Sequence, residues 1–186
     1  MRARTWAVLR MLELHAYALD SAAPSGTVVG AGNVMIFAQG RTGTTLLESL
    51  LCSTGLFEGL HEPLNTVTRE VLFPVRYLRG LALRRAPHKI VLHVKPMHLQ
   101  QDRRRPVDVR SFLEAMHDEG WTIVHVFRSD TVKQILSLFV AEARGQFHNT
   151  DTETVTEDIC FDVPPDYFLE RIRERRASLQ MEQSIL

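Results

Sequence analysis

Three short apolar runs alternate with longer stretches of helical periodicity along this chain. The runs cover residues 34–38, 89–94 and 121–127, and the two later ones are rich in β-branched side chains. An uninterrupted apolar run of this length is typical of a strand that is buried on both faces of a parallel sheet. The pattern therefore predicts three strands of an α/β sheet.

Helical patterns fill the intervals between these runs. Glycines at positions 55, 120 and 145 follow three of the patterns, at points where helices commonly end. Strands that alternate with helices predict a central parallel sheet flanked by helices, with ligands bound at the carboxyl ends of the strands. The expected helices cover residues 5–19, 44–53, 65–86 with a break at Pro74, 108–119, 131–144 and 165–180.

The length of 186 residues fits one domain, with an N-terminal helix and linker at residues 1–32 and a core at residues 33–186. Because 22 basic residues balance 22 acidic ones, we do not expect nucleic acid to be the main partner. No apolar stretch is long enough for a transmembrane helix, so a cytoplasmic location is expected. The two cysteines, Cys52 and Cys160, are expected to be buried thiols in a reducing compartment.

The segment QGRTGTT at residues 39–45 joins the first predicted strand to its helix. Backbone N–H groups and the positive end of a helix converge at such a junction, which suits a phosphate. Its two glycines permit close backbone approach, its threonines add hydroxyl donors, and its arginine can make two hydrogen bonds to one anion. The candidate phosphate-binding residues are Gly40, Arg41, Thr42, Gly43, Thr44 and Thr45.

This loop differs from the nucleotide-triphosphatase pattern GxxxxGK[ST]. Ala38 replaces its first glycine and Thr44 replaces its lysine, which disfavours a P-loop nucleotide kinase, the alternative enzyme class. The loop instead resembles the 5′-phosphosulfate loop of the sulfotransferase family, a basic residue followed by x-G-[ST]-[ST] directly after the first strand. The resemblance implies a P-loop-containing three-layer fold and the donor 3′-phosphoadenosine 5′-phosphosulfate.

A second element of the same family is similar to residues 123–137. In sulfotransferases a strand ends in an arginine that binds the 3′-phosphate of the donor, together with a serine on the following helix. Arg128 and Ser137 are the matching residues, and Ser129 is the alternative to Ser137. The sequences of residues 45–51 and 61–63 most resemble those of bacterial enzymes that sulfate carbohydrates and glycolipids. These enzymes usually continue past the point that corresponds to residue 186, which implies a shortened member.

The resemblance implies transfer of a sulfuryl group to a hydroxyl of a carbohydrate or glycolipid, without a metal. Arg41 and Lys95 are expected to neutralise the leaving phosphate. Glu62, which precedes Pro63 as the base does in the bacterial enzymes, is the first candidate for the base, and His98 is the second. A catalytically silent protein of the same fold remains the alternative outside the enzymes.

Two charged segments have a plainer interpretation. The basic run at residues 103–105 is expected to be a solvated loop, and the charges at residues 170–176 are expected to lie on an exposed, salt-bridged helix face. Binding of an anionic acceptor by the basic run is the alternative to a solvated loop.

Overall fold

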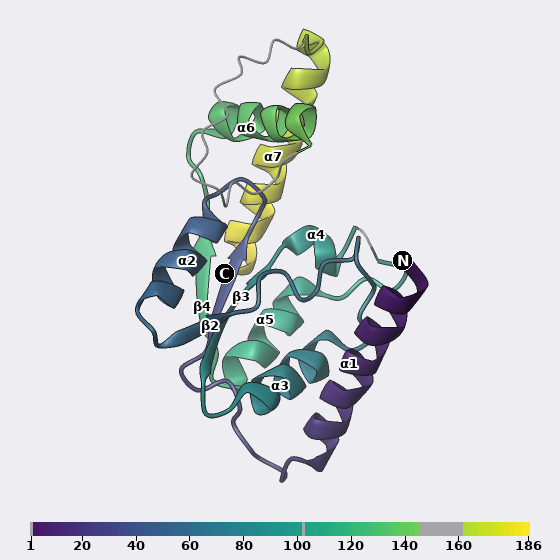
Figure 1. Ribbon diagram of the computed structural model, residues 1–186. Coiled ribbons are helices and arrows are strands. Elements are labelled where there is room, and N and C mark those ends of the chain that lie inside the picture. The colour runs from purple at the N-terminus through teal and green to yellow at the C-terminus, as the bar shows by residue number, and fades with distance from the viewer. Residues whose placement is uncertain (1, 102, 146–161) are drawn as a thin grey trace.

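The computed structural model describes residues 2–101, 103–145 and 162–186. The three predicted strands are present as β1 (Val34–Ala38), β3 (Lys89–Val94) and β4 (Thr122–Val126), and a short β2 (Phe57–Gly59) adds a fourth. All pairs are parallel and the order is β2-β3-β1-β4. The predicted α/β class with a central parallel sheet is therefore confirmed (Figure 1).

The central strand β1 is buried on both faces, as its apolar run predicts. Successive side chains of a strand point to opposite faces, so Ile36 and Phe37 enter different halves of the core. On the Ile36 side the sheet is covered by α2 (Thr44–Ser53), which contributes Leu47 and Leu51. This packing holds the start of α2 directly beyond the carboxyl end of β1.

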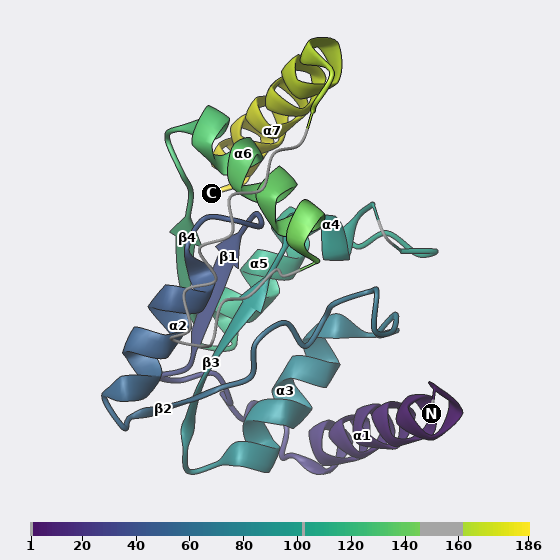
Figure 2. The same ribbon diagram turned by 45° about the horizontal axis from the view of Figure 1, so that its top comes forward.

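The other face of the sheet carries the larger half of the core. Helices α3 (Pro74–Arg85) and α5 (Val109–Asp118) pack there, and α1 (Arg2–Ala22) lies outside α3 (Figures 1 and 2). Gly80 of α3 permits close contact with α1, because a Cβ at this position would overlap the carbonyl oxygen of Ala16. Helices therefore flank both faces of the sheet.

Two helices stand beyond the carboxyl edge of the sheet. Helix α6 (Thr131–Arg144) pairs with α7 (Pro165–Ile185) through buried Phe139 and Ile172 (Figure 1). The C-terminal end of α7 returns to the body of the molecule, where Ile185 packs on the core and the carbonyl of Ser184 accepts a hydrogen bond of 2.8 Å from Arg110. Helix α7 therefore crosses the edge at which ligands of parallel sheets usually bind.

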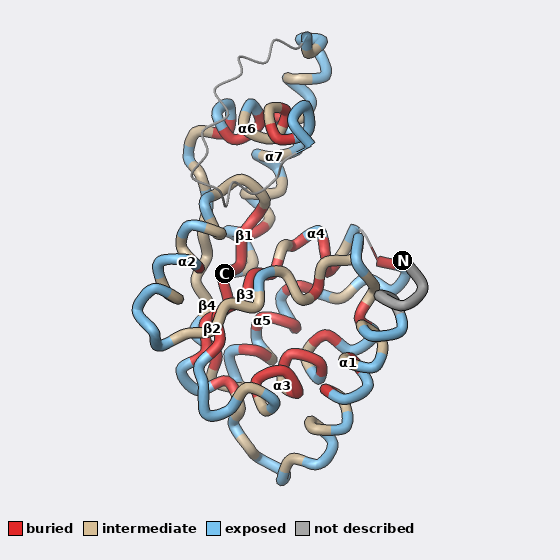
Figure 3. The backbone as a smooth tube through the Cα atoms, viewed as in Figure 1, coloured by how far each residue is buried: buried red, intermediate tan, exposed pale blue. Residues whose placement is uncertain are grey.

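The structure departs from the predicted helices at two points. Residues 65–73 form turns, because the Asn65 side chain accepts a hydrogen bond from the Val67 amide and Pro74 begins α3 at its first position. A short helix that was not predicted, α4 (Pro96–Leu99), follows β3. Figure 3 shows that burial concentrates in the sheet and in the inner faces of α3 and α5.

Candidate functional site

The predicted site residues gather at the carboxyl edge of the sheet. The phosphate loop follows β1, Lys95 follows β3, Arg128 follows β4, and Glu62 lies three residues beyond β2. Ser137 comes from α6 and reaches the same edge through its contact with the loop. Parallel strands thus bring together residues that are up to about 100 positions apart in sequence.

The loop between β1 and α2 contains two residues with left-handed backbone conformations. Gly43 caps α2 in the left-handed region with φ 94°, and Arg41 is also left-handed with φ 66°. A Cβ built on Gly43 would meet no atom within 4 Å, and one on Gly40 would meet only Lys95 Cε at 4.0 Å. The two glycines are therefore uncrowded, at the start of a helix, where backbone N–H groups favour an oxyanion.

The loop contacts α6 directly. Arg41 donates from Nε and Nη2 to Ser137 Oγ, at 3.1 and 3.0 Å, so the two predicted phosphate elements meet. Gln134 Nε2 donates to the carbonyl of Gly40 at 2.7 Å and holds the loop from the same helix. Arg128 is half-buried at the end of β4, whereas the alternative Ser129 is exposed.

The first candidate base is paired with the predicted cation. Lys95 Nζ lies 2.6 Å from Glu62 Oε1, and only 13% of the Glu62 side chain is exposed. Burial alone would raise the pKa of Glu62, but the hydrogen bond and charge of Lys95, with smaller effects of His98 and His93, bring it below its usual value. Glu62 is therefore a carboxylate at neutral pH, held beside the cation that lies over Gly40.

The second candidate base lies close to the first. His98 is buried in α4, and its charge is among those that lower the pKa of Glu62. Its backbone N–H donates to the Lys95 carbonyl at 3.0 Å. Both candidates therefore belong to one cluster with Lys95.

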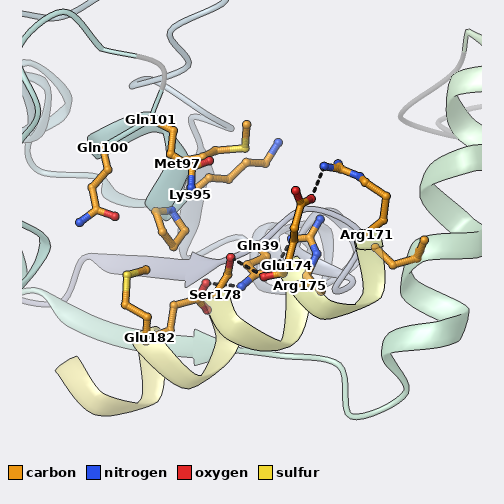
Figure 4. A pocket seen from close by; sticks show the side chains of 13 residues that line it. Gln39, Lys95, Met97, Gln100, Gln101, Arg171, Glu174, Arg175, Ser178 and Glu182 are labelled. Carbon is orange, nitrogen blue, oxygen red and sulfur yellow. Dashed lines mark hydrogen bonds and ion pairs between the residues drawn. The ribbon is translucent and has the colours of Figure 1, made fainter. Parts of the chain in front are cut away.

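A cavity of about 450 Å³ opens next to this cluster, between the strand ends, α4 and α7 (Figure 4). Lys95 lines it together with two neighbouring glutamines and several residues of α7. Its lining is mixed, with amides, charges of both signs and methionine side chains, as in sites for polar organic molecules. The polar lining residues are Gln39, Lys95, Gln100, Gln101, Arg171, Glu174, Arg175, Ser178 and Glu182.

Helix α7 contributes Arg175, from the charged segment at residues 170–176, and Glu182, which lies beyond that segment. Glu182, only 1% exposed, accepts a hydrogen bond of 2.5 Å from Gln39 and lies 3.1 Å from His125 Nε2. Arg175 donates to the same Gln39 side chain (Figure 4). Within residues 170–176 the exposed, salt-bridged face is largely as predicted, because Glu174 is exposed and pairs with Arg171 at 2.6 Å, whereas Arg171 and Arg175 are half-buried. The spacing of seven between Arg175 and Glu182 places both on one side of a helix, which is the only sequence signal for this stripe.

The side of the site near Arg128 has little room. Leu179 and Glu182 of α7 fill the space between Thr42 and Arg128, and the remaining void is about 10 Å³. A void of this size holds at most about one water molecule. The space beside Arg128 is therefore too small for a phosphate group unless α7 shifts.

The basic run before Pro106 differs from its prediction at one residue, since Arg104 and Arg105 are exposed as expected and Arg103 is not. Arg103 is buried and donates to the backbone carbonyls of Val71 and His98, so it braces the segment behind α4 instead of lying in a solvated loop. Cys52 is half-buried and unpaired, and Cys160 lies outside the described residues.

Within residues 2–101, 103–145 and 162–186, no three His, Cys, Asp or Glu side chains are grouped so that they could share a metal ion. None of the helices described is long and apolar enough to cross a membrane.

No protein-family model, curated protein or solved structure matches this chain. Its candidate function therefore rests on the phosphate loop, the Lys95–Glu62 pair and the adjoining cavity.

Proposed function

We propose that this protein is a sulfotransferase that moves a sulfuryl group from 3′-phosphoadenosine 5′-phosphosulfate to a hydroxyl of a carbohydrate or glycolipid. The observation that carries the proposal is a half-buried Lys95–Glu62 pair whose lysine side chain lies beside Gly40 of the candidate phosphate loop. A cation and a carboxylate base side by side are what transfer of a charged group to a hydroxyl requires. In this proposal the loop is a P-loop for phosphosulfate instead of a triphosphate.

The chain's own residues divide the work of an in-line displacement. The amides at the start of α2, with Arg41, hold the 5′-phosphate from which the sulfur–oxygen bond breaks. Lys95 neutralises the negative charge that develops on the leaving oxygen. Glu62 takes the proton of the acceptor hydroxyl as the new sulfur–oxygen bond forms. By analogy with phosphoryl transfer, positioning and charge stabilisation supply most of the rate.

The pairing of Lys95 with Glu62 implies an order in which the two residues act. While they are paired, Lys95 keeps the pKa of Glu62 low and the carboxylate is a weak base. Movement of Lys95 toward a bound phosphosulfate would leave burial as the dominant influence, and burial raises the pKa of Glu62. Glu62 therefore becomes a stronger base when the donor is in place.

The cavity beside the pair is the proposed acceptor site. Lys95, on its wall, links the cavity to Glu62, and the volume of about 450 Å³ falls in the range of sites for small organic ligands. A hydroxyl bound there would approach the loop past Lys95. The side of the loop near Arg128 would then be left to the nucleoside of the donor.

A catalytically silent binding protein is the second candidate. The contact of Arg41 with Ser137 and the closed space beside Arg128 favour it, because both occupy groups that a donor would need. A kinase has less support, since Thr44 stands where a P-loop lysine would contact the phosphates.

Calorimetric titration with adenosine 3′,5′-bisphosphate, and with ATP in the presence and absence of magnesium, tests the proposal. Magnesium-independent binding of the bisphosphate, stronger than that of ATP, is expected. Arg41→Ala and Arg128→Ala should each weaken it by about 10- to 100-fold, the loss of one charged hydrogen-bonding group. Arg104→Ala, an exposed change, is the control. A preference for ATP with magnesium would favour the kinase, and binding of neither nucleotide would remove the enzyme proposal.

A further inference from the structure

Glu48 is a buried carboxylate that the scheme above does not use. It lies in the second turn of α2, the helix that begins at the phosphate loop, and it is only 3% exposed. A buried charge is costly unless hydrogen bonds or opposite charges satisfy it. Its partners therefore indicate what it holds in place.

Glu48 contacts the loop that carries Glu62. Its Oε1 accepts a hydrogen bond of 2.9 Å from the His61 backbone N–H, and its Oε2 lies 3.0 Å from His61 Nδ1. The same Oε2 lies 3.0 Å from Nε2 of buried His93 on β3, in a contact with poor hydrogen-bond alignment. Burial alone would raise the pKa of Glu48, but His93 and the His61 backbone lower it below its usual value, so the group is charged.

The backbone at this point is shaped around the carboxylate. His61 has φ 53°, in the left-handed region that a residue with a side chain rarely occupies. Its carbonyl accepts a hydrogen bond of 2.7 Å from the His93 amide, which fixes the loop to β3. A Cβ at Gly59 would lie 2.5 Å from Glu48 Oε1, so a glycine is needed there for the carboxylate to fit.

These contacts fix the direction of the Glu62 side chain. Two bonds to Glu48 and one to β3 hold His61 in its left-handed conformation, and the chain then turns so that the next side chain meets Lys95 at 2.6 Å. We propose that Glu48 is a positioning residue, which aims Glu62 at Lys95 and couples the phosphate-loop helix to the base. Its effect on transfer rests on the proposed function, whereas its effect on the Glu62–Lys95 pair does not.

Glu48→Asp and Glu48→Gln test this inference in the full chain. The aspartate keeps the charge but is one methylene shorter, so it cannot hold His61 at the same position. The glutamine keeps the shape and the oxygen that accepts from the His61 N–H. The first readout is the pKa of Glu62, followed by carboxyl ¹³C NMR and assigned with Glu62→Gln. Glu48→Asp should raise this pKa toward that of an exposed glutamate, and Glu48→Gln should leave it close to wild type.

The second readout is turnover. Glu48→Asp should lower kcat by about a hundredfold, as expected for a base displaced by roughly 1 Å, and should leave the affinity for the bisphosphate unchanged. Glu48→Gln should keep most of the wild-type rate. If Glu48 only stabilised the fold, Glu48→Asp would lower thermal stability without lowering kcat at unchanged bisphosphate affinity. An unchanged Glu62 pKa in folded Glu48→Asp would overturn the inference, whatever the activity. A wild-type chain that binds no bisphosphate would overturn the proposed function alone.

Discussion

At the scale of single residues, the pairing of Glu62 with Lys95 makes the most specific prediction. Glu62→Gln keeps the shape of the side chain and its contact with Asn65, but it cannot accept a proton. Turnover should fall by about 10²- to 10⁴-fold, the usual contribution of a general base, with unchanged affinity for the bisphosphate. Transfer of labelled sulfate and calorimetry measure the two effects, and Glu58→Gln on β2 is the matched control. Wild-type turnover in Glu62→Gln would move the role of base to His98.

Removal of the cation from this pair should change the pH dependence of the site. In Lys95→Met, burial becomes the main influence on Glu62, so its pKa should rise above the usual value of a glutamate instead of lying below it. Because the wild-type pKa is lowered in the folded state, the pair stabilises the fold above the unfolded pKa. This contribution is lost as the pH falls through the folded pKa.

Two measurements follow this change. Carboxyl NMR of Lys95→Met should show Glu62 titrating at higher pH than in wild type. Urea unfolding should show a loss of stability at pH 7 that disappears as the pH falls below the folded pKa of wild-type Glu62, where this carboxyl is protonated in both proteins. A stability difference that is independent of pH would show that Lys95 acts through packing alone.

At the scale of elements, the contact between α1 and α3 depends on a single small residue. Gly80 faces the backbone of Ala16, so a larger side chain would force the helices apart. Gly80→Val should destabilise the fold by about 1–3 kcal/mol or more through overpacking. Arg84→Ala, an exposed change on the same helix, should cost little. Denaturant unfolding compares the two variants, and equal stability would mean that α1 does not rest on α3 in solution.

At the scale of the whole molecule, Glu182 ties α7 to the sheet beside Arg128. It is buried against Gln39 and His125, whereas Glu174 on the same helix is exposed and pairs with Arg171 three residues away. Glu182→Ala should cost about 1.5–3 kcal/mol, the value of hydrogen bonds to a charged group, and Glu174→Ala at most about 0.5 kcal/mol.

The same variant tests whether α7 limits donor binding. Glu182 and Leu179 fill the space beside Arg128, so weaker docking of α7 should make that space accessible. Glu182→Ala should therefore bind the bisphosphate more tightly than Glu174→Ala does, and amide exchange should speed up in the last turns of α7. Tighter binding without faster exchange would contradict this explanation.

Local signals in the chain were sufficient for the main elements. Two kinds of signal act within a few residues and were visible in the sequence: the apolar runs of β1, β3 and β4, and the glycines after α2, α5 and α6. The candidate phosphate loop between the first strand and its helix was visible in the same way. The three residues of β2 carry no apolar run, and they are a strand only because β3 offers its edge. Residues 65–73 looked helical, but turn hydrogen bonds and Pro74 end that pattern.

The candidate site divides in the same way. Its loop, Lys95, Glu62 and Arg128 could be named from the sequence because each directly follows a strand or resembles a motif, and parallel strands place such residues at one edge. The contacts of Glu48 with two histidines, of Glu182 with Gln39, and of Arg103 with the Val71 carbonyl join segments 13 to 143 residues apart. Charged residues in a sequence are expected on the surface, and only packing decides which of them are buried and paired. The order of elements and the glycine-containing loop after β1 thus follow from the sequence alone, whereas the direction of the Glu62 side chain and the position of α7 across the candidate site follow from tertiary contacts.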